Sequence, residues 1–272
     1  MKVAVVGHVE WVDFVRVERL PQPGDIVHAQ ETWAEPAGGG AVAAVVLAAL
    51  AGECLLITAL GDDALGRRAA VELQALNVRV AAAIRPEPQR RAVTYVDSSG
   101  ERTITLLSHK LIPCGADALP WDELVDMDAV YFTGGDTQAL RAARAARTLV
   151  GTARELPTLV EAHVQLDALV RSGSDPGETY EEGMLDPPPR LSVATAGATG
   201  GLVTESGQET RYAAARLPGP VSDMYGAGDS FAAGLTFGLG SAQGLQHALE
   251  VAAACAARAL TRRGAYGGEL TP

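Results

Sequence analysis

The residue pattern best suited to chemistry is Gly226-Ala227-Gly228-Asp229, which is followed by apolar residues at helical spacing from Phe231 onward. Small residues let the backbone turn so that several N–H groups converge at the start of a helix, where they and the helix dipole attract anionic oxygen. A carboxylate in that turn can take a proton from an attacking hydroxyl, while the N–H groups stabilise charge on the transferred group. A purely structural alternative is that Asp229 caps a glycine-rich helix start.

Three more glycine-rich segments could meet a ligand, and each has a structural alternative. The triple glycine 38–40 precedes a run of small residues, so it would let a substrate lie against the main chain or let a helix pack closely on a sheet. The two aspartates in segment 61–66 suit a metal ion, but a helix cap explains them better. The segment from Thr195 to Gly201 could seat a nucleotide by backbone contact, or could be a plain hairpin turn.

Composition excludes several classes of protein. The chain has 272 residues, of which 47% are apolar, so it can build a large core. With 22 Lys and Arg against 33 Asp and Glu, the formal charge is 22 − 33 = −11, which argues against nucleic-acid and anionic-membrane partners. The longest uncharged stretch, 36–52, is too rich in Ala and Gly for a membrane span. The three cysteines are far apart in the sequence, which argues against disulfides and against a zinc site. They predict a cytoplasmic location.

Short apolar runs alternate with helical periodicity along the chain, which is typical of a mostly parallel α/β sheet. Asn77 plausibly ends the first of the periodic helices. The expected strands are 3–6, 55–60, 129–133, 158–161, 191–195 and 201–204, and the expected helices are 41–50, 65–76, 231–239 and about 243–260.

Two regions alternate with the two-residue period of half-buried strands. They are 11–17 with 26–33, and a hairpin of 91–97 with 101–107 around Ser98-Ser99-Gly100. We therefore expect a small antiparallel sheet attached to the α/β body, placed as a lid that excludes water from a transfer reaction. A decorative or dimerisation sheet without a catalytic part is the alternative.

Taken in order, these segments resemble the ribokinase-like, or PfkB, family of carbohydrate kinases. Segment 38–40 resembles its N-terminal signature, and residues 222–231 (Ser-Asp-Met-Tyr-Gly-Ala-Gly-Asp-Ser-Phe) resemble its C-terminal signature Asp-Thr-x-Gly-Ala-Gly-Asp-x-Phe. The resemblance implies a single α/β domain over 1–272, with a doubly wound, mostly parallel sheet flanked by helices. It also implies an antiparallel lid formed by segments of about 11–35 and 90–108.

The resemblance further implies ATP- and Mg²⁺-dependent phosphoryl transfer to a hydroxyl of a sugar or sugar-like small molecule. Asp229 would be the catalytic base, and the N–H groups of Gly226, Ala227 and Gly228 the anion hole. The family's Asn-x-x-Glu element falls, in degenerate form, on segment 172–175. The other implied contacts are Ser172, Thr195, Gly197 and Gly200 for the nucleotide, Asp175 for magnesium, and Glu10, Asp13, Gly38 and Gly39 for the acceptor.

Departures from the family pattern concern the acceptor above all. Ala43 stands where the signature supplies a sugar-binding Asn, and Val12 stands where an acidic residue is usual, although Glu10 and Asp13 flank it. Because a buried unpaired sugar hydroxyl costs about 1–3 kcal/mol, these losses predict a different acceptor or a weakly bound one.

Two other functions remain open at this stage. A nucleotide- or metabolite-binding protein of the same fold with weak or lost kinase activity would explain the missing polar groups. A dinucleotide-dependent oxidoreductase is disfavoured because no glycine fingerprint follows the first strand. The alternating face of the lid also leaves open a homodimer through the lid sheet.

Overall fold

The central sheet positions the candidate residues at its carboxyl edge. A computed structural model describes residues 1–267, and within them this sheet has nine strands in the order β13-β12-β11-β10-β9-β8-β1-β4-β5. Neighbours from β11 to β5 are parallel, whereas β12 and β13 form an antiparallel edge. The strands are β1 (Val3–Val6), β4 (Cys54–Gly61), β5 (Val78–Arg85), β8 (Ala129–Phe132), β9 (Thr148–Thr152), β10 (Ala168–Ser172), β11 (Leu191–Thr195), β12 (Gly201–Glu205) and β13 (Gln208–Tyr212).

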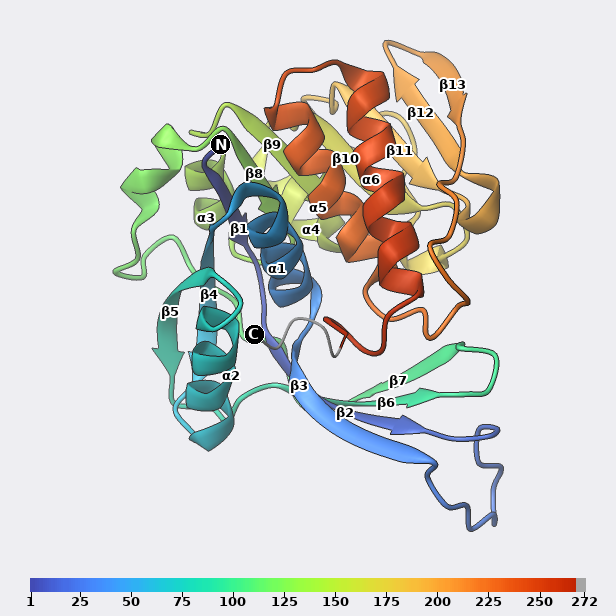
Figure 1. Ribbon diagram of the computed structural model, residues 1–272. Helices are drawn as coiled ribbons and strands as arrows, with labels where there is room; N and C mark the ends of the chain where they lie inside the picture. The colour runs from blue at the N-terminus through green and yellow to red at the C-terminus, as the bar shows by residue number, and fades with distance from the viewer. Residues whose placement is uncertain (268–272) are drawn as a thin grey trace.

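Helices cover both faces of this sheet (Figure 1). They are α1 (Gly39–Ala51), α2 (Ala64–Gln74), α3 (Thr137–Ala143), α4 (Leu156–Ala162), α5 (Ala227–Gly240) and α6 (Leu245–Leu260), with 3-10 turns η1 (Trp121–Asp126), η2 (Ala153–Glu155), η3 (Pro176–Glu178) and η4 (Gly197–Thr199). Helices α1, α5 and α6 pack into one core cluster, and α3 and α4 into the other. Alanine and glycine surfaces let α5 and α6 approach closely, since a Cβ at Gly238 would lie 2.4 Å from Ala248 Cα.

A second, four-stranded sheet extends beneath α5 and α6 (Figure 1). Its order is β3-β2-β6-β7, with β2 (Glu10–Arg16), β3 (Glu31–Ala37), β6 (Arg91–Val96) and β7 (Arg102–Leu106). Two antiparallel hairpins meet at a parallel β2–β6 pair. Its inner face is aromatic: Phe14 stacks on Trp33 with ring centroids 4.8 Å apart and meets Tyr225 edge-on at 4.9 Å. This sheet is hereafter called the lid sheet.

The predicted fold class is confirmed, and two expected strands are wrong. Residues 158–161 belong to helix α4, whose Pro157 suits a first helical turn and whose buried Leu159 and Ala162 are spaced three apart. The strand in this part of the chain is β9, which precedes α4. Residues 26–30 are exposed and outside any strand, and the strand begins only at Glu31. Alternation in 26–30 therefore did not reflect burial, because those residues are exposed.

Other expectations from composition concern the membrane and the cysteines. None of the helices within residues 1–267 is long and apolar enough to cross a bilayer. Cys54 is a buried free cysteine, and Cys114 and Cys255 are partly buried free cysteines.

Candidate active site

Asp229 occupies the first turn of helix α5. The residue that caps this helix is Gly226, in the left-handed conformation with φ 70°, and no side chain caps the helix N-terminus. The interpretation of Asp229 as an N-cap is therefore wrong. Because the first N–H groups of a helix have no partner within it, the turn 226–229 presents uncapped donors beside a carboxylate that is not used to hold the helix.

The glycine pair at the start of α1 lies directly against Asp229. A Cβ built on Gly39 would lie 2.9 Å from Asp229 Oδ1 and 2.9 Å from Thr133 Oγ1. Gly38 has φ 84°, and its N–H donates to the Tyr225 hydroxyl at 3.1 Å. Thr133 follows β8, so the carboxyl edge of the sheet, the α1 start and the α5 start meet at one point. This edge is where α/β proteins bind ligands.

Glu10, at the start of β2, adds a buried charge next to this point. Its Oε1 lies 2.7 Å from Arg90 Nε and 3.4 Å from His8 Nε2, and a Cβ at Gly38 would touch its side chain at 3.0 Å. Burial alone would raise the pKa of Glu10, but the hydrogen bond and charge of His8, with nearby positive charges, lower it below its usual value. Glu10 is therefore held as a carboxylate.

Asp229 has the opposite electrostatic setting. Burial raises the pKa of its carboxyl group above the usual aspartate range, and nearby basic side chains offset only part of this effect. Those side chains are His8, Arg154 and Arg102. A raised pKa makes the Asp229 carboxylate a better proton acceptor than an ordinary surface aspartate.

The residues expected at the nucleotide lie further along the same sheet edge. Ser172 and Thr195 are register partners at the ends of β10 and β11, and Thr195 O accepts from Gly173 N at 2.8 Å. Gly197 and Gly200 enclose the turn η4, where Gly200 N donates to Gly197 O at 3.1 Å. The segment does form the hairpin between β11 and β12, and its role at a nucleotide stays a prediction.

Two carboxylates converge just beyond β10. Arg154 Nη2 lies 2.7 Å from Asp175 Oδ2 and 2.8 Å from Glu178 Oε1, while Glu178 Oε2 accepts from Ser172 N at 2.6 Å. A backbone hydrogen bond from Gly177 and the Arg154 charge lower the pKa of Asp175. Glu178 was not expected from the sequence, although Asp175-Pro176-Gly177-Glu178 keeps the spacing and the glutamate of Asn-x-x-Glu.

Asp13 does not join the other expected acceptor residues. Side chains alternate along a strand, so Asp13 lies on the face of β2 opposite to Glu10, where its Oδ2 accepts from Arg91 Nη2 at 2.7 Å. Asp63 caps helix α2 by accepting from Gly66 N at 2.8 Å. The helix-cap interpretation is confirmed for Asp63, whereas Asp62 pairs with Arg67 at 3.2 Å. Within residues 1–267 no cluster of three or more His, Cys, Asp or Glu side chains could hold a metal ion.

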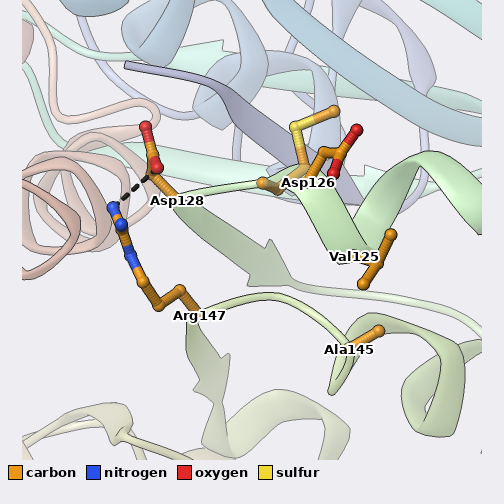
Figure 2. A pocket seen from close by; sticks show the side chains of 6 residues that line it. Val125, Asp126, Asp128, Ala145 and Arg147 are labelled. Atoms are coloured by element: carbon orange, nitrogen blue, oxygen red, sulfur yellow. Dashed lines mark hydrogen bonds and ion pairs between the residues drawn. The ribbon is translucent and has the colours of Figure 1, made fainter.

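A surface cavity of about 360 Å³ lies at the opposite edge of the sheet (Figure 2). The cavity lies beside the amino ends of β8 and β9. An ion pair between Arg147 and Asp128, 2.6 Å apart, lines it. Its lining residues are Val125, Asp126, Met127, Asp128, Ala145 and Arg147. None of the candidate site residues is among them, so this cavity is separate from the candidate site at the carboxyl edge.

Comparison with known proteins shows the family of the chain. The model for "pfkB family carbohydrate kinase" matches residues 1–156 and 137–271, which together span nearly the whole chain. The chain belongs to the pfkB family of carbohydrate kinases. The resemblance inferred from the signatures is confirmed.

Three relatives show how far the pfkB similarity extends. Aminoimidazole riboside kinase of Salmonella typhimurium is 29% identical over 85% of this chain and 83% of its own. ATP-dependent ribose-1-phosphate kinase of Halopiger xanaduensis is 27% identical over 97% of this chain and 94% of its own. Ribokinase of Arabidopsis thaliana, solved with ribose and ATP, superposes with a TM-score of 0.74 at 20% identity, covering 97% and 93% of the two chains. The present chain therefore shares the fold of that ribokinase.

Proposed function

We propose that the protein transfers the terminal phosphoryl group of ATP to a hydroxyl of a sugar or sugar-like small molecule, with Asp229 as the general base. The observation that carries the proposal is the position of Asp229, whose carboxylate faces Gly39 and Thr133 rather than capping its helix. The acceptor oxygen attacks phosphorus as its proton passes to Asp229, and the bond from phosphorus to the ADP oxygen breaks.

The turn 226–228 receives the transferred group in this proposal. Three features support that role: the uncapped N–H groups at the start of α5, the positive end of the helix dipole, and the open space beside Gly228, where an added Cβ would meet nothing within 4 Å. Fixed donors cost no reorganisation as charge develops on the phosphoryl oxygens.

ATP binding is supported by two relatives, one named an ATP-dependent kinase and the other solved with ATP. In this protein the nucleotide would contact the ends of β10 and β11 and the turn that follows β11. Ser172 and Thr195 lie at the two strand ends, and Gly197 and Gly200 lie in the turn. Backbone groups dominate this set, which fits an acidic protein that neutralises phosphates without a basic surface.

Asp175 and Glu178 would hold Mg²⁺ together with the phosphates. Their oxygens suit a hard cation, and both contact the same Arg154 nitrogen, which places them within reach of one ion. Two carboxylates are enough, since Mg²⁺ is commonly bound by one or two carboxylates plus substrate phosphates. The ion would neutralise charge on the phosphates, while Arg154 holds the two carboxylates in place without it.

The acceptor would lie between Glu10 and the Gly38–Gly39 backbone. Val12 and Ala43 are fully buried and apolar, so hydroxyl groups there must be bound by Glu10, His8 or main-chain atoms. The lid sheet would exclude water from this space. The names of the relatives direct the search toward ribosides and ribose phosphates.

A homodimer through the lid sheet is also proposed. Its edge strand β7 carries Ile104 and Leu106, exposed to 41% and 54%, and an exposed apolar edge strand is a surface for pairing. Light scattering on the purified protein tests this: a mass of two chains is expected, and replacement of both side chains by Lys should give one chain.

The experiment for the kinase proposal measures ADP release with ATP and Mg²⁺ across sugars, nucleosides and sugar phosphates. Turnover with at least one acceptor that requires Asp229 supports it. Thermal stabilisation by ATP and Mg²⁺ without turnover on any acceptor would favour the second candidate, a nucleotide-binding protein of this fold with lost activity, which the apolar Val12 and Ala43 positions favour.

A further inference from the structure

The tip of the lid sheet is fastened to the segment that leads into the phosphoryl-binding turn. Gly100 O, in the turn between β6 and β7, accepts from Met224 N at 3.0 Å. Two lid arginines donate to carbonyls of the same segment: Arg16 Nη1 to Ser222 O at 3.3 Å and Arg102 Nη1 to Met224 O at 2.6 Å. The first residue of β7 therefore reaches a backbone atom two positions before Gly226.

Arg102 differs from three other cations around the site in having no carboxylate partner. Arg90 pairs with Glu10, Lys110 with Glu155, and Arg154 with Asp175 and Glu178. Across the part of the chain that the structure describes, the guanidinium of Arg102 forms no salt bridge, although the side chain is only partly exposed.

Arg102 is also close enough to both halves of the site for its charge to act on a carboxylate in each. Its positive charge lowers the pKa of Asp229, on the acceptor side, and that of Asp175, on the nucleotide side. With one nitrogen bound to a neutral carbonyl, the remaining N–H donors of the guanidinium are available for an anion. The turn 226–228 offers N–H groups to the same region, and a phosphoryl group is the anion that the reaction brings there.

We infer that Arg102 is a phosphate-binding residue supplied by the lid, which contacts the terminal phosphates of ATP and the group in transfer. The inference rests on the proposed kinase function. A guanidinium matches phosphate oxygens with paired N–H donors, and it stays protonated while the phosphorus–oxygen bond to ADP breaks and the bond to the acceptor forms. Binding of a nucleotide with a terminal phosphate then stabilises the docked lid.

The test compares Arg102→Gln and Arg102→Lys with Arg19→Gln, which removes the same charge from an exposed lid loop where Arg19 pairs with Asp25 at 2.6 Å. For Arg102→Gln we expect kcat/KM for ATP to fall about 10²- to 10³-fold, the loss typical of one oxyanion donor. The Kd for ATP, by titration calorimetry, should rise at least tenfold while the Kd for AMP stays within twofold. Arg102→Lys should recover part of the loss, and Arg19→Gln should match the wild type.

Two results would overturn the inference. One is an unchanged Kd and kcat/KM for ATP in Arg102→Gln. The other is an equal loss of affinity for ATP and AMP, which would mean that Arg102 only supports the lid structure. The calorimetric arm needs no turnover, so a wild-type protein that binds ATP but phosphorylates nothing would refute the kinase proposal while still deciding the role of Arg102.

Discussion

Two neighbouring ion pairs of the lid sheet provide a matched test of how burial sets the role of Glu10. Glu10–Arg90 and Asp13–Arg91 join the same two strand regions, and both have N–O distances of 2.7 Å. They differ in exposure: the side chains of the first pair are each 8% exposed, and those of the second are 48% and 34% exposed. Glu10→Gln and Asp13→Asn each remove one carboxylate charge from this otherwise matched setting.

The expected losses of unfolding free energy differ severalfold. Glu10→Gln leaves the Arg90 guanidinium buried without its counter-charge, and breaking a buried pair in this way costs about 3–5 kcal/mol. Arg90 Nε lies close to Glu10 Oε1 but is not aligned for a hydrogen bond. We therefore expect a loss of unfolding free energy at the lower end of this range. Asp13→Asn breaks a solvent-screened pair worth about 0–1 kcal/mol. Adding Arg90→Met to Glu10→Gln should restore most of the loss, because no unpaired charge remains.

Urea denaturation followed by circular dichroism measures both free energies. The sign of the pH dependence is fixed by the lowered pKa of Glu10: its stabilisation is complete above the usual glutamate pKa and is lost as the pH falls through the lowered value. The difference between the two variants should therefore shrink in acid. Equal losses for Glu10→Gln and Asp13→Asn at pH 7 would refute the argument that burial makes Glu10 a fixed charge.

Three further outcomes follow from the site. Asp229→Asn should raise the melting temperature at pH 7. The pKa of Asp229 is raised in the folded protein, so the ionised carboxylate destabilises the fold above that raised pKa, and the effect vanishes below the usual aspartate pKa. A lower melting temperature by calorimetry would contradict this. Gly39→Ala places a methyl group 2.9 Å from Asp229 Oδ1 and should lower kcat/KM about 100-fold through misplacement, with far-UV circular dichroism unchanged; wild-type kinetics would count against the proposed geometry. Glu178→Gln should raise the Mg²⁺ concentration needed for half-maximal activity, and an unchanged Mg²⁺ titration would exclude Glu178 as a ligand.

The fold could be predicted from the sequence because the hydrophobic pattern within each segment and the order of the signature segments indicated the same fold. Buried strands such as 3–6 and 191–195 are nearly continuous apolar runs, and the signature segments occur in the family order. Strand β9 was not predicted, and residues 158–161 of helix α4 were predicted as a strand because short apolar stretches fit both periods. The lid strand β3 was placed too early because alternation alone does not show which residues find a surface to cover.

Residues of the candidate site could be predicted only where a residue carries its own sequence signal. Asp229 and the glycines beside it stand in recognisable turns. Arg90 and Arg102 carry no such signal. Arg90 directly precedes β6 and Arg102 begins β7, so each reaches the candidate site only through the pairing of the lid strands. In the sequence, a single arginine of this kind is indistinguishable from a surface charge. Glu178 did have a signal in its spacing from Asp175.

The most direct test of the proposed mechanism is the rate of acceptor phosphorylation by Asp229→Asn. Asp62→Asn is the matched control, since Asp62 is 67% exposed and pairs with Arg67 across the surface at 3.2 Å. With saturating ATP and the best acceptor found, Asp229→Asn should lower kcat about 10²- to 10⁴-fold, the usual contribution of a positioned general base, while ATP still binds. A kcat within threefold of the wild type would contradict the assignment of Asp229 as the base.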